Sequence, residues 1–168
     1  MNRMTPSFQV HTIEPVYDAD SRILILGSFP SIKSREANFF YGHPQNRYWK
    51  MMAAIYGEEE LMSVEEKKTF LRKHHIAMWD SIHSCTITGS SDSSIKDVVP
   101  NDFSRILDTA DIRQIFCNGT ASYHVYVKYV LPRTGREARK MPSTSPANAA
   151  WSLEKLISSW QVVRNYTG

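Results

Sequence analysis

An unbroken aliphatic run, Ile23-Leu24-Ile25-Leu26, most constrains what this chain can fold into. Four consecutive aliphatic residues ended by Gly27 are typical of a strand that is buried on both faces, as in the middle of a parallel sheet. We therefore predict a central strand over 22–26.

Further strands and helices alternate along the chain. Strands are expected at 76–81, 112–117 and 136–141, with an edge strand near 8–13 inside an otherwise irregular start. Helices are expected at 44–56, 63–74, 101–109, 120–130 and 149–160. Ser63 and Glu66 form a capping box for the second helix, and the polar segment 84–95 indicates a loop. This order predicts one α/β domain over 1–168, a three-layer α/β/α sandwich around a central, mostly parallel four-stranded sheet with 136–141 at an edge.

Composition narrows the class of protein. The 168 residues are 42% hydrophobic and 22% charged, which is typical of a globular chain. No apolar run approaches the roughly 18–20 residues that cross a bilayer, and the polar N-terminus lacks the apolar stretch of an export signal. Cys85 and Cys117 have no metal-ligand spacing, and we expect both to be reduced thiols. We predict a cytoplasmic monomer whose net charge of +3 permits a polyanionic partner without requiring one.

Two proline-containing loops of small residues are the main candidates for a ligand site. Gly27-Ser28-Phe29-Pro30-Ser31 follows the central strand, and Pro142-Ser143-Thr144-Ser145-Pro146-Ala147-Asn148-Ala149 precedes the last helix. Open α/β sheets bind ligands at the carboxyl ends of their strands. Hydroxyls and free backbone amides in such loops suit a phosphate-bearing partner. A basic cluster adjoins the second loop (Arg133, Arg136, Arg139, Lys140), whereas another is typical of a solvated helix face (Lys67, Lys68, Arg72, Lys73).

Several kinds of chemistry lack their motifs. The chain has no P-loop, no dinucleotide-binding fingerprint and no serine-hydrolase elbow. None of its six histidines forms a convincing zinc set with carboxylates or thiols. Asp80 and Asp92 are the only acids near the candidate loops, which carry no carboxylate pair. We therefore predict no metal and no cofactor, and a pocket of amides, hydroxyls and aromatic rings that can hold a nucleobase and phosphates.

Four segments in order resemble the uracil-DNA glycosylase superfamily. They are Gly27-Ser28-Phe29-Pro30-Ser31, the segment Tyr41-Gly42-His43-Pro44-Gln45-Asn46-Arg47-Tyr48-Trp49, Phe116-Cys117-Asn118-Gly119-Thr120-Ala121, and Ser143-Thr144-Ser145-Pro146-Ala147-Asn148. The second is similar to that of mismatch-specific uracil/thymine glycosylases. The complete set resembles most the hypoxanthine-DNA (deoxyinosine) glycosylase branch, over residues 22 to about 150.

The resemblance implies a monofunctional DNA glycosylase of base excision repair, which flips a deaminated nucleotide out of the duplex and hydrolyses its N-glycosidic bond. Asn46 and Ser28 would be catalytic, with Asn46 positioning the water or the leaving base. The base-binding residues would be Phe29, Phe40, Tyr41 and Asn118. The DNA-binding residues would be Pro30, Ser31, Ser143, Thr144, Ser145, Pro146, Ala147 and Asn148. No lysine is expected in the pocket, so Schiff-base lyase chemistry is not expected.

The chain also departs from the superfamily. Members usually carry Asp or Asn just after the glycine of the first loop to orient the attacking water, and this chain has Ser28. The uracil-specific branch has a histidine and a leucine wedge in the last motif, where this chain has Ser143 and Ala147. The resemblance therefore implies hypoxanthine as the expected substrate. A uracil, xanthine or mismatch-specific glycosylase, a non-catalytic nucleic-acid or nucleotide-binding module, and a flavodoxin-like phosphate-ligand domain remain alternatives.

Overall fold

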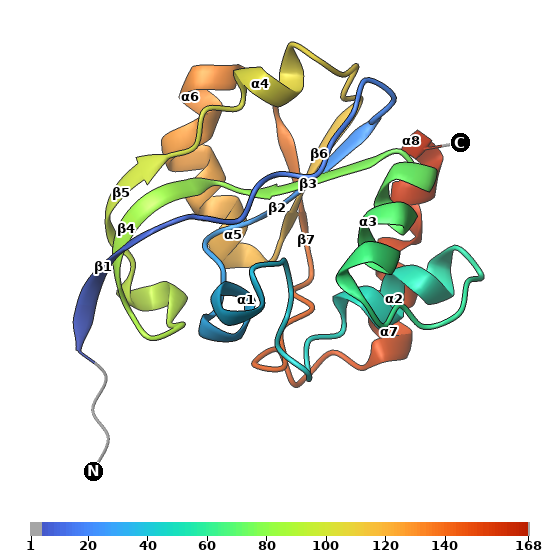
Figure 1. The fold of residues 1–168 in the computed structure, drawn as a ribbon, viewed down its shortest axis with the longest axis horizontal. Coiled ribbons are helices and arrows are strands. Elements are labelled where there is room, and N and C mark those ends of the chain that lie inside the picture. The colour runs from blue at the N-terminus through green and yellow to red at the C-terminus, as the bar shows by residue number, and fades with distance from the viewer. Residues whose placement is uncertain (1–4, 168) are drawn as a thin grey trace.

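A four-stranded parallel sheet with helices on both faces organises the chain (Figure 1). The computed structural model describes residues 5–167, so residues 1–4 and 168 of the predicted domain lie outside it. The strands lie in the order β3-β2-β6-β7 (Ile76–Asp80, Ile23–Gly27, Gln114–Asn118, Ala138–Met141). β2 pairs in parallel with β3 and β6, and all five of its residues are buried. The predicted fold class, the central strand and the edge position of β7 are confirmed.

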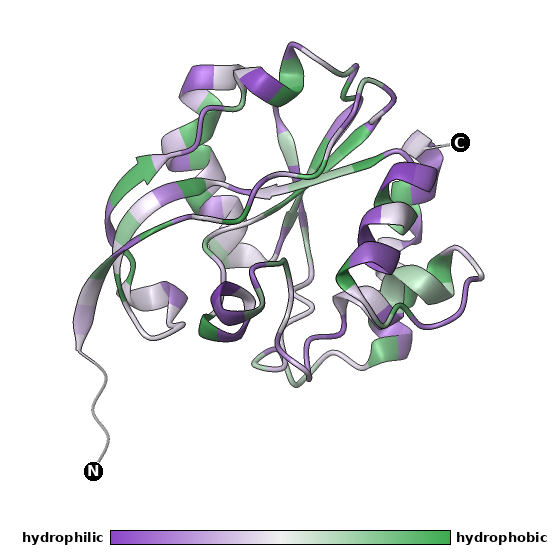
Figure 2. Cartoon of the chain, viewed as in Figure 1, coloured by the Kyte–Doolittle hydropathy of each residue, from purple (hydrophilic) through white to green (hydrophobic). Residues whose placement is uncertain are grey.

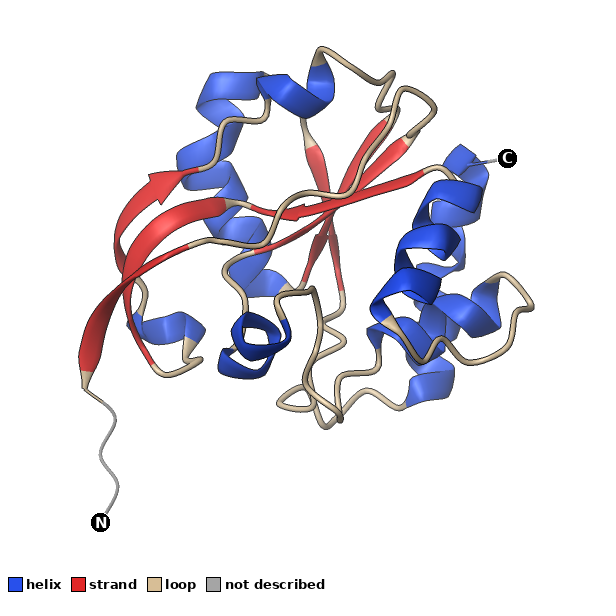
Figure 3. Ribbon diagram, viewed as in Figure 1, coloured by secondary structure: helices blue, strands red, loops and turns tan. Residues whose placement is uncertain are grey.

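Two groups of helices cover the sheet. α2, α3 and α7 (Tyr48–Ile55, Val64–Lys73, Leu153–Trp160) gather on one side, and α4, α5 and α6 (Ser104–Leu107, Thr120–Val125, Leu131–Thr134) on the other (Figure 3). Figure 2 shows the hydrophobic colour concentrated where the strands cross the middle of the molecule, which is the core that both helical layers bury. The C-terminus adds η3 and α8 (Gln161–Val163, Arg164–Thr167). Among the described helices, none has the length and apolar character needed to cross a membrane.

A second, antiparallel sheet was not predicted. It has the order β1-β4-β5 (Pro6–Val10, Ile82–Thr88, Lys96–Pro100), with the short turn η1 (Asp92–Ser94) between β4 and β5. The prediction of a loop over 84–95 is therefore wrong for its first part. β4 pairs with strands on both sides, and Ser84, Cys85 and Ile87 are buried there. The polar residues of β4 gave no sign of this burial in the sequence, because the burial depends on pairing with strands distant in the chain.

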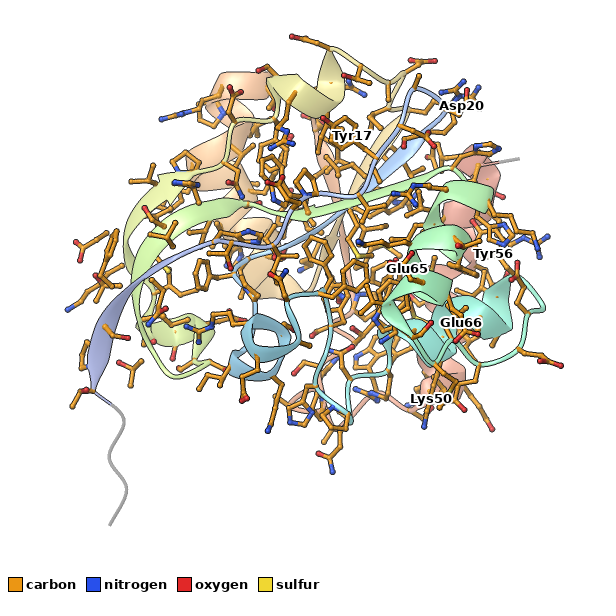
Figure 4. All side chains as sticks on the ribbon, viewed as in Figure 1. Tyr17, Asp20, Lys50, Tyr56, Glu65 and Glu66 are labelled. Atoms are coloured by element: carbon orange, nitrogen blue, oxygen red, sulfur yellow. The ribbon has the colours of Figure 1, made fainter. Side chains whose placement is uncertain are left out.

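Helix boundaries follow local capping. Ser63 and Glu66 form the predicted capping box of α3, and Glu66 is labelled in Figure 4. The helix predicted at 44–56 begins only at Tyr48, since the Asn46 side chain accepts a hydrogen bond from the Tyr48 backbone N–H. The last helix begins after Ser152, whose hydroxyl accepts from the Lys155 N–H. The helix predicted at 101–109 shortens to α4, while α5 continues through a π-helical turn, η2 (Tyr126–Val130), into α6.

The carboxyl ends of the four parallel strands meet at one edge of the sheet. Gly27, Asp80, Asn118 and Met141 end these strands. The first candidate loop leads from β2 into the short helix α1 (Ile32–Ala37), whose N-terminus Ser31 caps by accepting from the Ser34 N–H. The second loop follows β7. The fold thus brings both loops to the edge where open α/β sheets bind ligands.

Candidate active site

A cavity of about 490 Å³ opens at this edge, within the roughly 300–1,000 Å³ typical of small-molecule sites. The predicted site residues that line it are Ser28, Phe29, Pro30, Ser31, Phe40, Tyr41, Asn46, Asn118, Ser143, Thr144, Ser145, Pro146 and Ala147. Asn148 lines an adjoining cavity of about 550 Å³, which shares several walls with the first. The segments selected from the sequence therefore meet in one place.

A buried carboxylate, Asp80, lines the cavity and is paired with a buried histidine. Asp80 ends β3, and its Oδ2 lies 2.8 Å from His11 Nε2 in a hydrogen bond. The other carboxylate oxygen lies against Gly27, where an added Cβ would come within 2.4 Å of Asp80 Oδ1. Only glycine leaves room for this approach, so the glycine of the first loop is explained by the carboxylate beside it.

The first loop is pinned by backbone hydrogen bonds. The Gly27 and Ser28 carbonyls accept from the N–H groups of Ser81 and Ile82, at 2.9 and 3.1 Å. Ser28 is 6% exposed, and its hydroxyl donates to Asp92 Oδ1 at 2.8 Å. The ring of Phe29 packs into a small core with Ile82 and the rest of β4, so most of its surface is already covered.

Tyr41 differs from the other predicted base-binding aromatic residues because it is only partly buried. Phe40 is 2% exposed and belongs to the main core. Tyr41 has a φ of 52° and stacks on Tyr48 with ring centroids 4.6 Å apart. Its hydroxyl is buried without a hydrogen-bond partner among the described residues. Burial and, to a smaller extent, the Asp80 charge raise the pKa of this hydroxyl.

A chain of hydrogen bonds fixes the two candidate asparagines. Asn118 Nδ2 donates to Thr144 Oγ1 at 3.0 Å, and Thr144 Oγ1 donates to Asn46 Oδ1 at 2.9 Å. The Thr144 N–H donates to Asn118 Oδ1, and the Tyr48 N–H donates to Asn46 Oδ1. Both lone pairs of the Asn46 oxygen are thereby engaged, which leaves its Nδ2 as the group free to act in the cavity. Thr144, predicted to bind DNA, is fully buried and joins the two amides.

Arg47 holds the second loop in place. Its guanidinium donates to the carbonyls of Ser145 and Asn148 at 2.8 and 3.1 Å, and also to that of Trp151. Its backbone N–H donates to the Thr144 carbonyl at 3.1 Å. A guanidinium so occupied with carbonyls is a structural anchor, and the sequence resemblance gave no role for it.

The second loop also folds onto itself. Asn148 Nδ2 donates to the Ser143 carbonyl at 3.0 Å, and the Ser145 N–H donates to Ser143 Oγ at 3.1 Å. Gly119, with a φ of 100°, lies under Ser143, whose Cβ would be 3.0 Å from an added Cβ. Ala147 is left exposed at the tip of the loop, at the border of both cavities.

Two carboxylates reach the cavity from outside the candidate loops. Asp80 arrives from β3 and Asp92 from the turn after β4. Asp92 is accessible to solvent through the open side of the cavity, and the surrounding protein still displaces enough water to raise the pKa of its carboxyl, against the Ser28 hydrogen bond that lowers it. The expectation that the loops themselves carry no carboxylate pair holds, but the site contains two acids. The sequence placed both acids near the candidate loops, and the structure shows that both line the cavity.

Three further residues, His43, Ser90 and Lys33, line the cavity without having been assigned to it. Lys33 contradicts the expectation that no lysine lies in the pocket, because its side chain is 58% exposed but still lines the cavity, with its ammonium 3.8 Å from Glu36 Oε1. The described residues hold no cluster of three or more histidines, cysteines or acids that could bind a metal ion. Burial raises the pKa of Cys85 to about 11 and of Cys117 to about 12, so both are unreactive as nucleophiles.

The two basic clusters lie in different surroundings, one on a helix surface and the other beside the second loop. Lys67 and Lys68 of α3 lie over the rings of Trp49 and Phe39, which is a helix-surface role. In the other cluster, Arg136 donates to the Ile112 carbonyl, and Lys140 lines the cavity that contains Asn148. Lys140 is therefore the member of that cluster which the fold brings to the second loop.

The fold and this site define an α/β protein whose ligand pocket consists of fixed amides, hydroxyls and aromatic rings at the carboxyl edge of a parallel sheet. Residues 14–164 match the family described as the Uracil DNA glycosylase superfamily, and the chain belongs to this superfamily of DNA glycosylases.

The chain is also similar to individual members over nearly its whole length. It is 32% identical over 148 residues to the hypoxanthine DNA glycosylase of Methanosarcina barkeri, covering 87% of this chain and 92% of that one. It is 33% identical over 149 residues to the hypoxanthine DNA glycosylase of Methanosarcina acetivorans, covering 88% and 93%. A solution NMR structure of a candidate uracil DNA glycosylase from Methanosarcina acetivorans has a TM-score of 0.77 and 34% identity, covering 92% of this chain and 96% of that one.

Proposed function

We propose that this protein is a monofunctional glycosylase that hydrolyses the N-glycosidic bond of deaminated bases in DNA, with hypoxanthine as the preferred base. Two relatives of about one-third identity carry that name. The observation that carries the proposal is the Asn118–Thr144–Asn46 chain, which holds the Asn46 amide in a base-sized cavity at the carboxyl edge of the sheet.

Tyr41 is the best candidate for stacking on a flipped base. Its ring has one face on Tyr48 and remains partly accessible, whereas Phe29 and Phe40 are nearly covered by the core. Base–aromatic stacking contributes about 1–3 kcal/mol per base and tolerates different bases. A flipped purine lying on Tyr41 would therefore offset part of the unstacking cost of leaving the duplex.

The part of the cavity beside Asp80 suits hypoxanthine better than its parent base, adenine. Deamination of adenine replaces an amino group beside a bare ring nitrogen with a carbonyl beside a ring N–H. Asp80 offers an acceptor and the unpartnered Tyr41 hydroxyl offers a donor, and both lie next to Gly27. A carbonyl and a neighbouring N–H complement this pair, whereas adenine presents the reverse pattern and would leave buried groups unpaired.

Asn46 is suited to stabilise the leaving base. Because its oxygen already accepts two hydrogen bonds, only its Nδ2 can donate into the cavity. The departing base carries negative charge in the transition state, and a fixed donor aimed at that charge lowers the barrier without reorganising. We assign Asn46 this role and leave proton removal from water to another group.

The second loop and the start of α1 are suited to hold the DNA strand. Ser31, Lys33 and Ser145 line the cavity, and Lys140 lines the adjoining one. Hydroxyls, backbone amides and lysines contact phosphates without reading sequence, as an enzyme that searches for rare lesions requires.

The direct test is excision from labelled duplexes that each carry one hypoxanthine, uracil or xanthine, with alkali to break abasic sites. We expect a hypoxanthine-dependent, alkali-dependent product, with weaker products from uracil and xanthine because they share the carbonyl and N–H pair. A strand break without alkali, with trapping of a borohydride-stable adduct, would instead indicate lyase chemistry at Lys33.

Asn46→Ala tests the site. The single-turnover rate constant should fall by about 100-fold or more, while DNA affinity stays within about tenfold of wild type. Asn165→Ala, an exposed asparagine at the C-terminal end, is the matched control. A wild-type rate in Asn46→Ala would refute the assignment. Lesion binding without any abasic product in the wild type would favour the non-catalytic binding module.

A further inference from the structure

Hydrolysis of the glycosidic bond needs a group that takes a proton from the attacking water. The first loop has no acid or amide for this purpose, and the Asn46 oxygen is fully engaged by Thr144 and Tyr48. Cys85 and Cys117 are buried and protonated. Among the described residues that line the cavity, this leaves the carboxylates Asp80 and Asp92 and the imidazole of His43.

Asp92 is the carboxylate with access to water. Asp80 is 3% exposed, its Oδ2 is hydrogen-bonded to His11, and its Oδ1 lies beside Gly27 as the acceptor assigned above to the base. Asp92 stands at the open side of the cavity and lines both it and the adjoining one. His43, on the opposite segment, uses Nδ1 to accept from the Gln45 N–H.

Ser28 holds the Asp92 carboxylate in a defined orientation. Its hydroxyl donates to Oδ1 at 2.8 Å, and its own backbone is fixed through the bond from the Ile82 N–H. The two residues come from separate parts of the sequence, the end of β2 and the turn after β4. A carboxylate held through one oxygen presents the other to solvent in the cavity.

We propose that Asp92 is the general base of the proposed glycosylase reaction and that Ser28 is its positioning residue. This rests on the proposed function. The water oxygen forms a bond to C1′ of the sugar and gives a proton to Asp92, while the bond from C1′ to the base breaks and its electron pair leaves with the base. The base gains its proton from solvent, and Asp92 returns its own to solvent. Asp92 thus supplies from a distant turn the acid that the first loop lacks.

The charges around Asp92 predict a particular pH dependence. The titratable groups that influence it or share one of its two cavities are Asp80, Tyr41, Cys85, His43, Lys33 and Lys140. Displacement of water by the protein, with a smaller contribution from Asp80, raises the pKa of the Asp92 carboxyl. A general base must be deprotonated, so excision should fall as pH drops through that raised pKa, above the range of an ordinary aspartate.

The test is the pH profile of single-turnover excision from a hypoxanthine duplex. Asp92→Asn keeps an acceptor for Ser28 but cannot take a proton, so the rate constant should fall by about 100-fold or more and the acid limb should disappear. Asp97→Asn is the matched control, because Asp97 is exposed on β5 at a φ of 56°, which asparagine tolerates. Melting temperature and lesion affinity should match wild type in both variants.

Ser28 gives a second readout that a merely structural residue would not change. Ser28→Ala removes a hydrogen bond to the charged carboxylate, so the pKa of Asp92 should rise further and the acid limb should move to higher pH. Ser28→Thr, which keeps the hydroxyl, should restore the limb toward its original position.

Three outcomes would overturn the proposal. They are an Asp92→Asn rate within threefold of wild type, an acid limb that persists in that variant, and a Ser28→Ala limb that does not move. If wild type excises uracil or xanthine instead, the same variants on that lesion decide the role of Asp92. If wild type excises nothing, the proposed function fails and this inference fails with it, a result that differs from active wild type with active Asp92→Asn.

Discussion

The two candidate loops are alike in sequence but are held in different ways. The first loop, 27–31, is attached through its own backbone to the start of β4, and Ser28, Phe29 and Pro30 are buried. The second loop, 142–149, is held by side chains, those of Arg47, Asn118, Asn148 and Trp160, and carries the exposed Ala147. The first loop is thus a rigid wall of the cavity fixed by its own backbone, whereas the second is a wall fixed by side chains. We assign the positioning of the general base to the rigid wall and the grip on DNA to the second loop.

Replacing Arg47, the anchor of the second loop, should give the largest effect and show most clearly that the two loops are held in different ways. Arg47→Ala leaves the carbonyls of Ser145 and Asn148 without their charged donor, and we expect the free energy of unfolding to fall by about 3 kcal/mol. Arg47→Lys should recover little, because one ammonium cannot reach several carbonyls in the geometry of a guanidinium. Urea unfolding measures the loss, with exposed Arg72→Ala as control. Unfolding within 0.5 kcal/mol of wild type (about the scatter of surface substitutions) would contradict the anchor.

A substitution at Gly27 of the rigid wall should lower both stability and excision activity. Gly27→Ala would place a Cβ 2.4 Å from Asp80 Oδ1, and shifting that buried pair should cost about 2 kcal/mol and most of the excision activity. Gly135→Ala is the control, since its φ of 65° carries the left-handed strain but nothing lies within 4 Å. It should lose about 1 kcal/mol with normal excision. Equal activity losses in the two variants would show that the Asp80 contact is irrelevant.

The contrast between the loops also shows which features of the fold and of the site could be predicted from the sequence. The central strand was predictable because four adjacent aliphatics carry their own burial signal, and the small-residue loops were predictable because they follow strands. β4 was not, since its burial comes from pairing with both β1 and β5. Arg47 was not, since the carbonyls that it binds lie about a hundred residues later in the chain. Asp92 could be placed near the loops from the sequence, but its hydrogen bond to Ser28 could not, because only the folded turn brings the two residues together.

Tyr41 should affect the rate of excision more than the affinity for DNA. Tyr41→Asn removes the ring while keeping a residue that tolerates the φ of 52°. Loss of stacking should slow single-turnover excision by about tenfold or more. Tyr41→Phe keeps the ring and loses only the hydroxyl, so it should mainly weaken discrimination against adenine. Rate constants and equilibrium affinities measured on the same duplexes separate the two effects. A large change in affinity with an unchanged rate would mean that Tyr41, like the second loop, acts in holding the DNA.

Replacing Lys140 should give the smallest effect, and it should change the affinity for DNA rather than the rate of excision. It is exposed on β7 and lines the cavity beside the second loop. If it neutralises one phosphate, Lys140→Ala should weaken binding several-fold and reduce the slope of log affinity against log salt by about 1. The excision rate at saturating enzyme should not change. Arg113→Ala is the control, because Arg113 is exposed just before β6, at the opposite edge of the sheet from the cavity. An equal salt dependence in the two variants would mean that charge on this face is not engaged with the strand. A loss of rate in Lys140→Ala would extend the chemistry to the second loop and remove the division between the two walls.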